Sequence, residues 1–389
     1  MEIYGFSFST LEWIILSTLL AAFVYQIYFY TRYIQGVLRY KRKIKKNKIT
    51  FQQELQPVSV IICAKNEAEN LRKYLPFILQ QDYPDYEVIV INDGSTDETD
   101  ILLRDLSSDN ARLRTTFVPV GANNISTKKL GLTLGIKASK FDILLFTDAD
   151  CMPEDKTWIN RMMRNFNNET AFVLGYGAYF HKKGFLNRLI TYDTLFNGLQ
   201  YMGMALAHKP YMGIGRNLAY RKDVFFKQKG FADNLKLNSG DDDLMVNHAA
   251  TAKNTRVEIA PDSLTWSEPN STFKGWLFQK QRHLAASKYY KFSSKFRLGF
   301  EPLTRAWFYI AFAAAMIIGM INFNFIVIGI AAAFFIVRFA TQLIIFNRSA
   351  HYFGDRKHFF WLLLFDIFLP LLSLYILLFS KKGRNKNWK

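Results

Sequence analysis

The chain has 389 residues, half of them hydrophobic and 36 of them phenylalanine, with a formal net charge of +18. This length allows one large core together with membrane segments. A basic balance suits nucleic acid, anionic lipid or phosphorylated substrates. Here the charge gathers beside apolar runs and no stretch interleaves aromatic residues with arginine, which argues against nucleic acid as a partner. The two cysteines, Cys63 and Cys151, form no CxxC pair, which argues against a disulfide framework and predicts small core residues.

Residues 11–30 form the first membrane-length apolar run. No basic stretch precedes the run and no small-residue cleavage site follows it, which disfavours a removed signal peptide. Eight Lys and Arg residues and no acid lie between 32 and 48. The positive-inside rule therefore places the amino terminus outside and residue 32 onward in the cytoplasm. We expect a transmembrane helix within 1–31 and a basic juxtamembrane linker over 32–56, either solvated or in contact with lipid headgroups.

The segment that follows, up to about residue 270, alternates between strand and helix patterns. Short apolar runs predict strands over 58–63, 87–91 and 143–146, and polar-capped stretches predict helices over 66–81, 99–109 and 126–139. Such repetition gives an α/β fold with a mostly parallel sheet and helices on both faces. Ligands of such sheets bind beyond the carboxyl ends of the strands.

Carboxylates follow two of these strands. Asp93, within Asn92-Asp93-Gly94, ends the 87–91 strand and can accept hydrogen bonds from a nucleobase or ribose; an Asx-turn is the plainer alternative, and both can hold. Asp148 and Asp150 follow the 143–146 strand at i and i+2. That spacing suits Mg²⁺ or Mn²⁺ shared with a diphosphate, against the alternative of an ordinary acidic turn.

A third acidic cluster is Gly240-Asp241-Asp242-Asp243-Leu244. Like charges packed together raise one another's pKa unless a cation compensates, which suits a general base acting on an alcohol. A helix amino terminus also favours acidic residues, and a helix carrying Leu244 is expected to begin here. One Asp can therefore cap the helix while another faces a cleft.

Basic residues supply the remaining motifs. Arg282, within Gln279-Lys280-Gln281-Arg282-His283, can contact a departing diphosphate, because a guanidinium binds two phosphate oxygens; a membrane-surface basic helix is an equal alternative. Lys128 and Lys129 are expected to be solvated helix residues rather than phosphate ligands. The glycine pair at 213 and 215 is not a Walker loop, because no Gly-Lys-Ser/Thr follows.

Three more apolar runs follow, at about 306–321, 325–346 and 359–379, before a basic tail over 381–386. Three full crossings from the cytoplasm would place that tail outside, against the charge rule. Asp366 and Pro370 lie in the middle of the last run and suggest a bent or re-entrant helix there. We assign 301–389 to a carboxyl-terminal transmembrane region with a basic tail.

In their order and spacing, these motifs resemble the family 2 glycosyltransferases, specifically the membrane-integrated inverting type that includes cellulose, hyaluronan and poly-N-acetylglucosamine synthases. The resemblance covers about residues 57–300 and the flanking helices. Those enzymes carry an Asp after the second strand, a DxD, a TED or GDD triplet and a Q-x-x-R-W motif. The matching positions are Asp93, Asp148 and Asp150, the 240–243 cluster, and Gln279 with Arg282.

The resemblance implies a GT-A type, Rossmann-like nucleotide-sugar domain over 57–300 with interfacial helices, on the cytoplasmic face of a bacterial-type inner or plasma membrane. It implies Mg²⁺ or Mn²⁺ at Asp148 and Asp150. The donor-binding residues that it implies are Asn66, Glu67, Asp93, Lys128, Asp148 and Gln279. The catalytic residues that it implies are Asp241, Asp242 and Arg282. Alignment on Leu244 makes Asp241 the base, whereas alignment on the Gly-Asp-Asp letters makes it Asp242; we favour Asp241.

One departure bears on the product. The Trp of Q-x-x-R-W, which lies under the acceptor sugar in polymer synthases, is His283 here. A smaller, polar ring holds a pyranose less well, so we expect transfer of a single sugar from a nucleotide-sugar donor, UDP-linked by resemblance, to a lipid-linked or glycan acceptor, with membrane lipids as further partners. The alternatives are a processive polysaccharide synthase and a non-catalytic membrane sugar-nucleotide sensor or scaffold.

Overall fold

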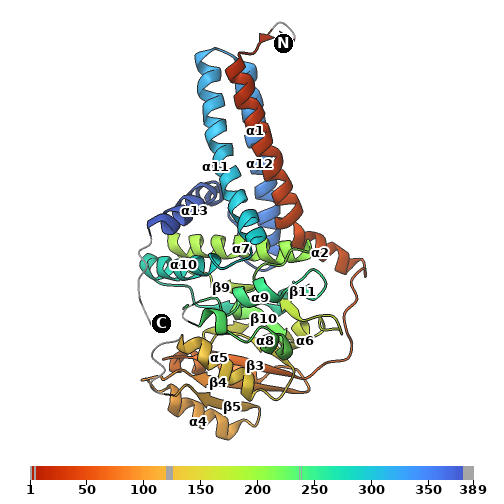
Figure 1. The fold of residues 1–389 in the computed structure, drawn as a ribbon, viewed down its shortest axis with the longest axis vertical. Helices are drawn as coiled ribbons and strands as arrows, with labels where there is room; N and C mark the ends of the chain where they lie inside the picture. The colour runs from red at the N-terminus through yellow and green to blue at the C-terminus, as the bar shows by residue number, and fades with distance from the viewer. Residues whose placement is uncertain (1, 4–5, 120–125, 236, 238, 380–389) are drawn as a thin grey trace.

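A computed structural model describes residues 2–3, 6–119, 126–235, 237 and 239–379. Three long helices stand together as a stalk, and a mixed α/β domain lies below them (Figure 1). A short hairpin, β1 (Glu2–Ile3) with β2 (Phe6–Ser7), precedes the stalk at its far end. The predicted basic tail at 381–386 lies outside the described residues.

A seven-stranded sheet forms the centre of the domain, in the order β11-β8-β10-β6-β3-β4-β5. Its strands are β3 (Val58–Ala64), β4 (Tyr86–Asn92), β5 (Leu113–Phe117), β6 (Ile143–Phe146), β8 (Phe172–Leu174), β10 (Leu218–Arg221) and β11 (Thr255–Val257). The pairs β6-β3, β3-β4 and β4-β5 are parallel, and β10 alone runs antiparallel to both of its neighbours. The predicted mostly parallel sheet is confirmed.

Helices cover both faces of this sheet. Every residue of β3 and β4 is buried, as expected for parallel strands covered on both sides. The domain helices are α3 (Ala68–Leu79), α4 (Thr99–Asp109), α5 (Thr127–Ala138), α6 (Trp158–Met163), α7 (Phe185–Leu206), α8 (Lys222–Lys227), α9 (Asp243–Ala249) and α10 (Phe273–Ser287). The first two and α6 share one hydrophobic core on one face, whereas α5 and α7 share the core on the other.

A second, three-stranded sheet lies beside the first, in the order β7-β12-β9. Its strands are β7 (Cys151–Pro153), β9 (Gly177–Tyr179) and β12 (Thr265–Ser267). Because β7 begins directly after Asp150, this sheet fixes the end of the Asp148–Asp150 turn.

Among the described residues, four helices are long and apolar enough to cross a membrane: α1 (Thr10–Phe29) with its π-helical continuation (Tyr30–Ile34), α11 (Phe292–Ile321), α12 (Phe325–Tyr352) and α13 (Phe360–Phe379). A short turn joins the second and third of these helices, and Asn324 in this turn caps α12 with its side chain. However, α11 begins at Phe292, so the domain boundary that we placed at 300 falls inside a continuous helix. The segment that we assigned as a linker also contains a helix, α2 (Gly36–Lys45).

The last apolar helix departs from the stalk. Whereas α1, α11 and α12 run along one another, α13 lies obliquely at the base, beside α7 and α10 (Figure 1). It continues without interruption past Pro370. The bent or re-entrant segment that the sequence suggested is therefore replaced by an oblique helix on the domain side of the stalk.

A close backbone crossing joins the stalk to the domain. A Cβ atom on Gly36 would lie 2.8 Å from the Cα atom of Gly203 in α7, so both positions need glycine. The π-helical turn Tyr30–Ile34 lies at the same junction and packs on α7. The two contacts together hold α7 of the domain close against the base of the stalk.

Candidate active site at the strand ends

Lys128, the first Asp of the DxD turn and part of the acidic triplet gather at the carboxyl ends of β3 and β6. A pocket there is lined by Lys128, Asp148, Gly215, Asp241 and Asp242, together with apolar side chains from the sheet and α5. Parallel neighbouring strands end at the same edge of a sheet, so residues that are far apart in sequence meet there. The structure thus brings together the DxD turn, the acidic triplet and the helix that carries Lys128.

Lys128 lies between two of the acidic motifs. Its ammonium group is 3.5 Å from Asp148 Oδ1 and 3.2 Å from Asp241 Oδ2. Burial would lower the pKa of Lys128, but the two carboxylates outweigh it and hold this pKa above its usual range. The neighbouring Lys129 is fully buried and donates to the backbone oxygen of Asn234 at 2.7 Å, and burial lowers its pKa to about 8. The expectation of a solvated side chain is wrong for Lys129, which is buried against Asn234, whereas Lys128 is partly exposed and paired with two carboxylates.

The three carboxylates of the acidic triplet have different surroundings. Asp242 caps α9, where its two oxygens accept from Gly215 N at 2.6 Å and from Asp243 N at 2.7 Å. Asp243 is buried and accepts from the Tyr290 hydroxyl at 2.7 Å. Asp241 contacts Lys128 and faces the pocket. Helix cap and cleft carboxylate therefore coexist in one triplet.

These surroundings separate the pKa values of the triplet. Burial acts to raise the pKa of Asp241, but Lys128 and Lys129 outweigh it and hold this pKa below the usual range. Burial and the charge of Asp241 raise the pKa of Asp242 to about 6. Burial and the charge of Asp242 raise the pKa of Asp243 to about 8. Asp241 thus has the lowest pKa of the three, and Asp243 has the highest.

Asp148 and Asp150 form an oxygen-rich corner of the site. Ligand atoms of Asp148, Asp150 and Cys151 lie within 4.8 Å of one another. Burial and the charge of Asp148 raise the pKa of Asp150 to about 6, which marks an excess of negative charge. The Cys151 thiol instead donates to Asp150 Oδ1 at 3.6 Å, and burial raises its pKa above its usual range, so it stays protonated. The two carboxylates, rather than the thiol, suit a hard divalent cation.

Arg216 is a buried cation near this corner that the sequence analysis did not single out. Its guanidinium donates to the backbone oxygens of Ala178 at 3.2 Å and Gly177 at 3.1 Å, and it lies 4.1 Å from the centroid of the Tyr179 ring. It partly offsets the negative charge that Asp150 carries. The only sequence signal was its place in the glycine-rich stretch after residue 213.

The residues predicted on the nucleoside side form a separate group around the β4 end. Asp93 is buried, accepts from the Thr127 hydroxyl at 2.6 Å and lies 3.9 Å from the Lys65 ammonium. Asn66 Oδ1 accepts from the backbone of Thr96 at 2.7 Å. Glu67, also buried, accepts from the Asn70 amide at 2.6 Å. Asn66 therefore shapes the turn after Asp93, whereas Glu67 contacts the first turn of α3, and both lie outside the pocket that Lys128 and Asp241 line.

Helix α10 carries the residues of the last predicted motif. Gln279 donates to the Tyr179 hydroxyl at 2.9 Å and accepts from Asn270 at 2.8 Å, so its amide is fixed at both ends. The backbone oxygen of Arg282 accepts from the Ser239 hydroxyl at 2.7 Å, next to the acidic triplet. His283 has an exposed side chain on the same helix. The motif thus lies against the cleft, although neither Gln279 nor Arg282 lines the pocket itself.

The sequence is similar to known glycosyltransferases. Residues 59–227 match the protein family described as glycosyl transferase family 2. A probable glycosyltransferase, YdaM, of Bacillus subtilis is 26% identical over 292 residues, which are 72% of this chain and 67% of that protein. The poly-β-1,6-N-acetyl-D-glucosamine synthase of Staphylococcus aureus is 29% identical over 170 residues, which are 43% of this chain and 38% of that protein. The match thus spans about two thirds of the first relative and under two fifths of the second.

Among solved structures, the mannosyltransferase PcManGT from Pyrobaculum calidifontis, in complex with GDP-Man and Mn²⁺, aligns with a TM-score of 0.57. The alignment covers 94% of this chain and 100% of that chain, at 17% sequence identity. At this identity the likeness concerns the fold. The predicted GT-A-like domain with flanking apolar helices is confirmed.

Proposed function

We propose that the chain, whose residues 59–227 match glycosyl transferase family 2, moves a sugar from a nucleoside-diphosphate donor to a membrane-associated acceptor, with inversion at the anomeric carbon. One observation carries this proposal: Lys128, Asp148 and Asp241 converge on one pocket below the stalk. The donor and the acceptor hydroxyl would meet there.

We propose that Asp93 holds the nucleoside, together with Asn66, which shapes its turn, and Glu67 at the start of α3. Asp93 is buried at the end of β4, beside the amino terminus of α5. Lys128, one residue further along α5, would then reach the diphosphate. Gln279 would contact the donor from α10, where its amide is already oriented by Tyr179 and Asn270.

The donor set at Asp148 and Asp150 fits a divalent cation. The two carboxylates have ligand atoms within 4.8 Å of each other, and the pKa of Asp150 stays raised although Lys128 and Arg216 offset part of their charge. When bound, Mg²⁺ or Mn²⁺ would neutralise charge that develops on the leaving diphosphate. The residues of this chain fix the geometry: β6 ends at Phe146, β7 begins at Cys151, and the turn between them carries both carboxylates, of which Asp148 lines the pocket.

Asp241 is the general base of the proposed reaction. It takes the proton from the acceptor hydroxyl while that oxygen bonds to the anomeric carbon and the diphosphate leaves with the bonding electrons. Asp242 is less suited, because both of its oxygens already accept backbone N–H groups. Lys128 lowers the pKa of Asp241. A diphosphate in the pocket would draw the ammonium away and make Asp241 a stronger base, and Arg282 would help to neutralise the leaving group.

The acceptor is a lipid-linked or glycan molecule at the membrane surface. The stalk contains three helices of membrane-spanning length directly above the domain. The basic residues of α2 lie at the base of this stalk, so we propose that the domain faces the cytoplasm, where anionic headgroups attract such segments.

A single transfer is expected because His283 stands where a stacking indole would hold a growing chain. An aromatic face offers rigid apolar contact for a sugar ring. A processive synthase is the second candidate, favoured by the relative that makes poly-β-1,6-N-acetyl-D-glucosamine. Mass spectrometry of extracted products separates the two. One added sugar in excess donor supports single transfer, and a long ladder supports the synthase.

The test of the function is a donor screen on the full chain in detergent or nanodiscs. Panels of UDP- and GDP-sugars, with a membrane lipid extract as acceptor, are assayed for nucleotide release and for sugar incorporation. We expect one donor to give lipid-dependent turnover with Mn²⁺ or Mg²⁺. Absence of turnover with every donor, despite saturable nucleotide binding, would contradict the proposal.

A further inference from the structure

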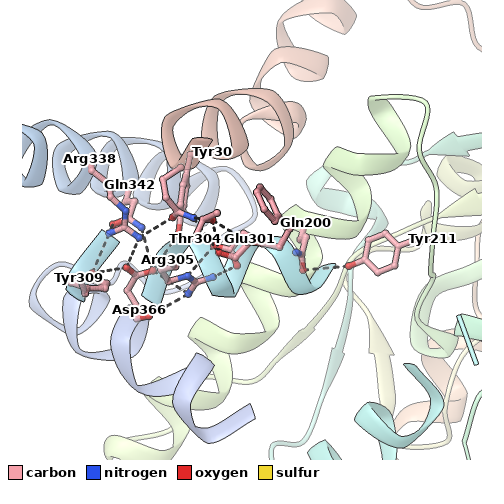
Figure 2. Close-up of polar contacts among 12 residues, drawn as sticks. Tyr30, Gln200, Tyr211, Glu301, Thr304, Arg305, Tyr309, Arg338, Gln342 and Asp366 are labelled. Carbon is pink, nitrogen blue, oxygen red and sulfur yellow. Dashed lines mark hydrogen bonds and ion pairs between the residues drawn. The ribbon is translucent and has the colours of Figure 1, made fainter. Parts of the chain in front are cut away.

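A buried ionic network joins α13 to the stalk (Figure 2). Its centre is Asp366 of α13, which is fully buried. Arg338 of α12 lies 2.8 Å from Asp366 Oδ2, and Arg305 of α11 lies 3.1 Å from Oδ1. The carboxylate also accepts hydrogen bonds from three further donors: the Tyr309 hydroxyl at 2.7 Å, the Gln342 amide at 3.2 Å and the Tyr30 hydroxyl at 3.3 Å. One side chain thus contacts residues from all three stalk helices.

The network is balanced in charge. Arg305 also donates from Nε to Glu301 at 2.9 Å, so two arginines face two carboxylates. The exposure of these four side chains is between 0% and 5%. Charges at this depth are costly unless they are paired and hydrogen-bonded. Five donors point at the Asp366 carboxylate, so this side chain has one favourable position. Because Asp366 belongs to α13, the same contacts fix the position of α13 relative to the stalk.

The position of α13 bears on the proposed active site. Its first half packs on α7, where the rings of Phe365 and Tyr192 lie 5.2 Å apart. It also contacts α10, which carries Gln279 and Arg282. Lys280 of α10 is paired with Asp193 of α7 at 2.6 Å. The helix that carries the predicted motif therefore contacts both α7 and α13.

We infer that Asp366 is a positioning residue: its network locks α13 to the stalk, and α13 in turn holds α10 at the catalytic cleft. Asp366 touches neither donor nor acceptor, and its effect passes through α10. The inference about catalysis rests on the proposed function. The inference about helix position does not.

The position is tested by a distance measurement between spin labels on α13, at Leu374, and α10, at Lys274. Both side chains are exposed, whereas the native cysteines Cys63 and Cys151 are buried. In the parent chain we expect one narrow distance distribution, and in Asp366→Asn a wider or shifted one, because Arg338 loses its carboxylate. An unchanged distribution in Asp366→Asn overturns the inference.

The catalytic consequence is measured separately. We expect Asp366→Asn to lower kcat by about 10²-fold, the size of effect that a displacement of about 1 Å can have. Nucleotide binding should keep its affinity and its stoichiometry per chain, which distinguishes displaced α10 from a partly unfolded sample. An altered distance with unchanged kcat would overturn the link to α10. Absence of transfer by the unmodified chain would contradict the proposed function and leave the distance result standing.

Two further variants keep the test decisive. Asp366→Leu with Arg338→Leu leaves the Glu301–Arg305 pair intact and is expected to fold, because apolar side chains often replace a buried ion pair without loss of stability. It should reproduce the altered distance and the low kcat, and wild-type values in it would overturn the inference. Glu12→Gln is the matched control: Glu12 is buried at the far end of the stalk, 3.2 Å from Asn324, and its kcat should not change.

Discussion

Two clusters of charged side chains lie at opposite sides of the domain–stalk junction. In the stalk, Asp366 and Glu301 are matched by Arg305 and Arg338, all nearly inaccessible to solvent. In the cleft, the carboxylates outnumber their cations, and Asp148 remains 36% exposed. The stalk cluster is complete without a ligand, whereas the cleft cluster has an excess of negative charge that faces an opening.

The difference separates structure from chemistry. A balanced, fully hydrogen-bonded set of charges fixes helices and has no capacity for a further ion. An acidic surplus at an accessible pocket raises the pKa of some members and can be relieved by a cation or by a substrate group. Four measurements on the cleft, taken from the largest effect to the smallest, test whether its surplus is functional.

Removal of divalent cations should have the largest effect. If the surplus at Asp148 and Asp150 is met by Mg²⁺ or Mn²⁺, excess chelator should abolish sugar transfer, and either ion should restore it. The stalk cluster needs no ion, so the melting temperature in detergent should change little. Full turnover in excess chelator would remove the metal role of both carboxylates.

Substitution of the base comes next. Asp241→Asn should keep nucleotide binding and lose transfer by roughly 10²–10⁴-fold, the usual size of general-base catalysis. Asp242→Asn at the neighbouring position is the control. It should lower the stability of the fold more than the rate of transfer, because Asp242 caps α9 and accepts a hydrogen bond from Gly215 N. If Asp242→Asn alone abolishes transfer, the assignment of the base is wrong.

Lys128→Met should have an intermediate effect. It removes the ammonium group that lies between Asp148 and Asp241 and that would contact the diphosphate. Loss of one charged hydrogen bond predicts a fall in kcat/KM of roughly 10- to 10²-fold, mostly through KM for the donor. The control is Lys137→Met on the same helix, outside the pocket. Equal kinetics for the two variants would show that Lys128 has no part in donor binding.

Asp243→Asn should have the smallest effect and a pH signature. The pKa of Asp243 is raised to about 8 in the folded chain, so between its ordinary pKa near 3.8 and about 8 the folded state binds more protons than the unfolded state. Stability contributed by this group therefore falls as pH rises through that window. Asn still accepts from the Tyr290 hydroxyl but does not titrate. The melting temperature of the variant should therefore exceed that of the parent by an amount that grows toward pH 8. Parallel curves would contradict the raised pKa.

The sequence by itself determined the local elements and the order of the motifs. The helix over 99–109 and the strand over 143–146 have the predicted bounds, because polar caps and short apolar runs act through neighbouring residues. Asp93 and Asp148 follow strands and meet at one edge for a general reason: the ends of parallel strands converge. The four apolar helices followed from length and composition alone.

Tertiary structure decided what depends on distant partners. Lys129 is buried because Asn234, 105 residues further along, accepts from it. Arg216 lies near Asp150 only because β7, β9 and β12 assemble around it. Asp241 and Asp242 both line the pocket, but Gly215 and the start of α9 occupy the oxygens of Asp242, which leaves Asp241 as the proposed base. The oblique position of α13 depends on a carboxylate that meets donors from three other helices, and no local pattern encodes such a meeting.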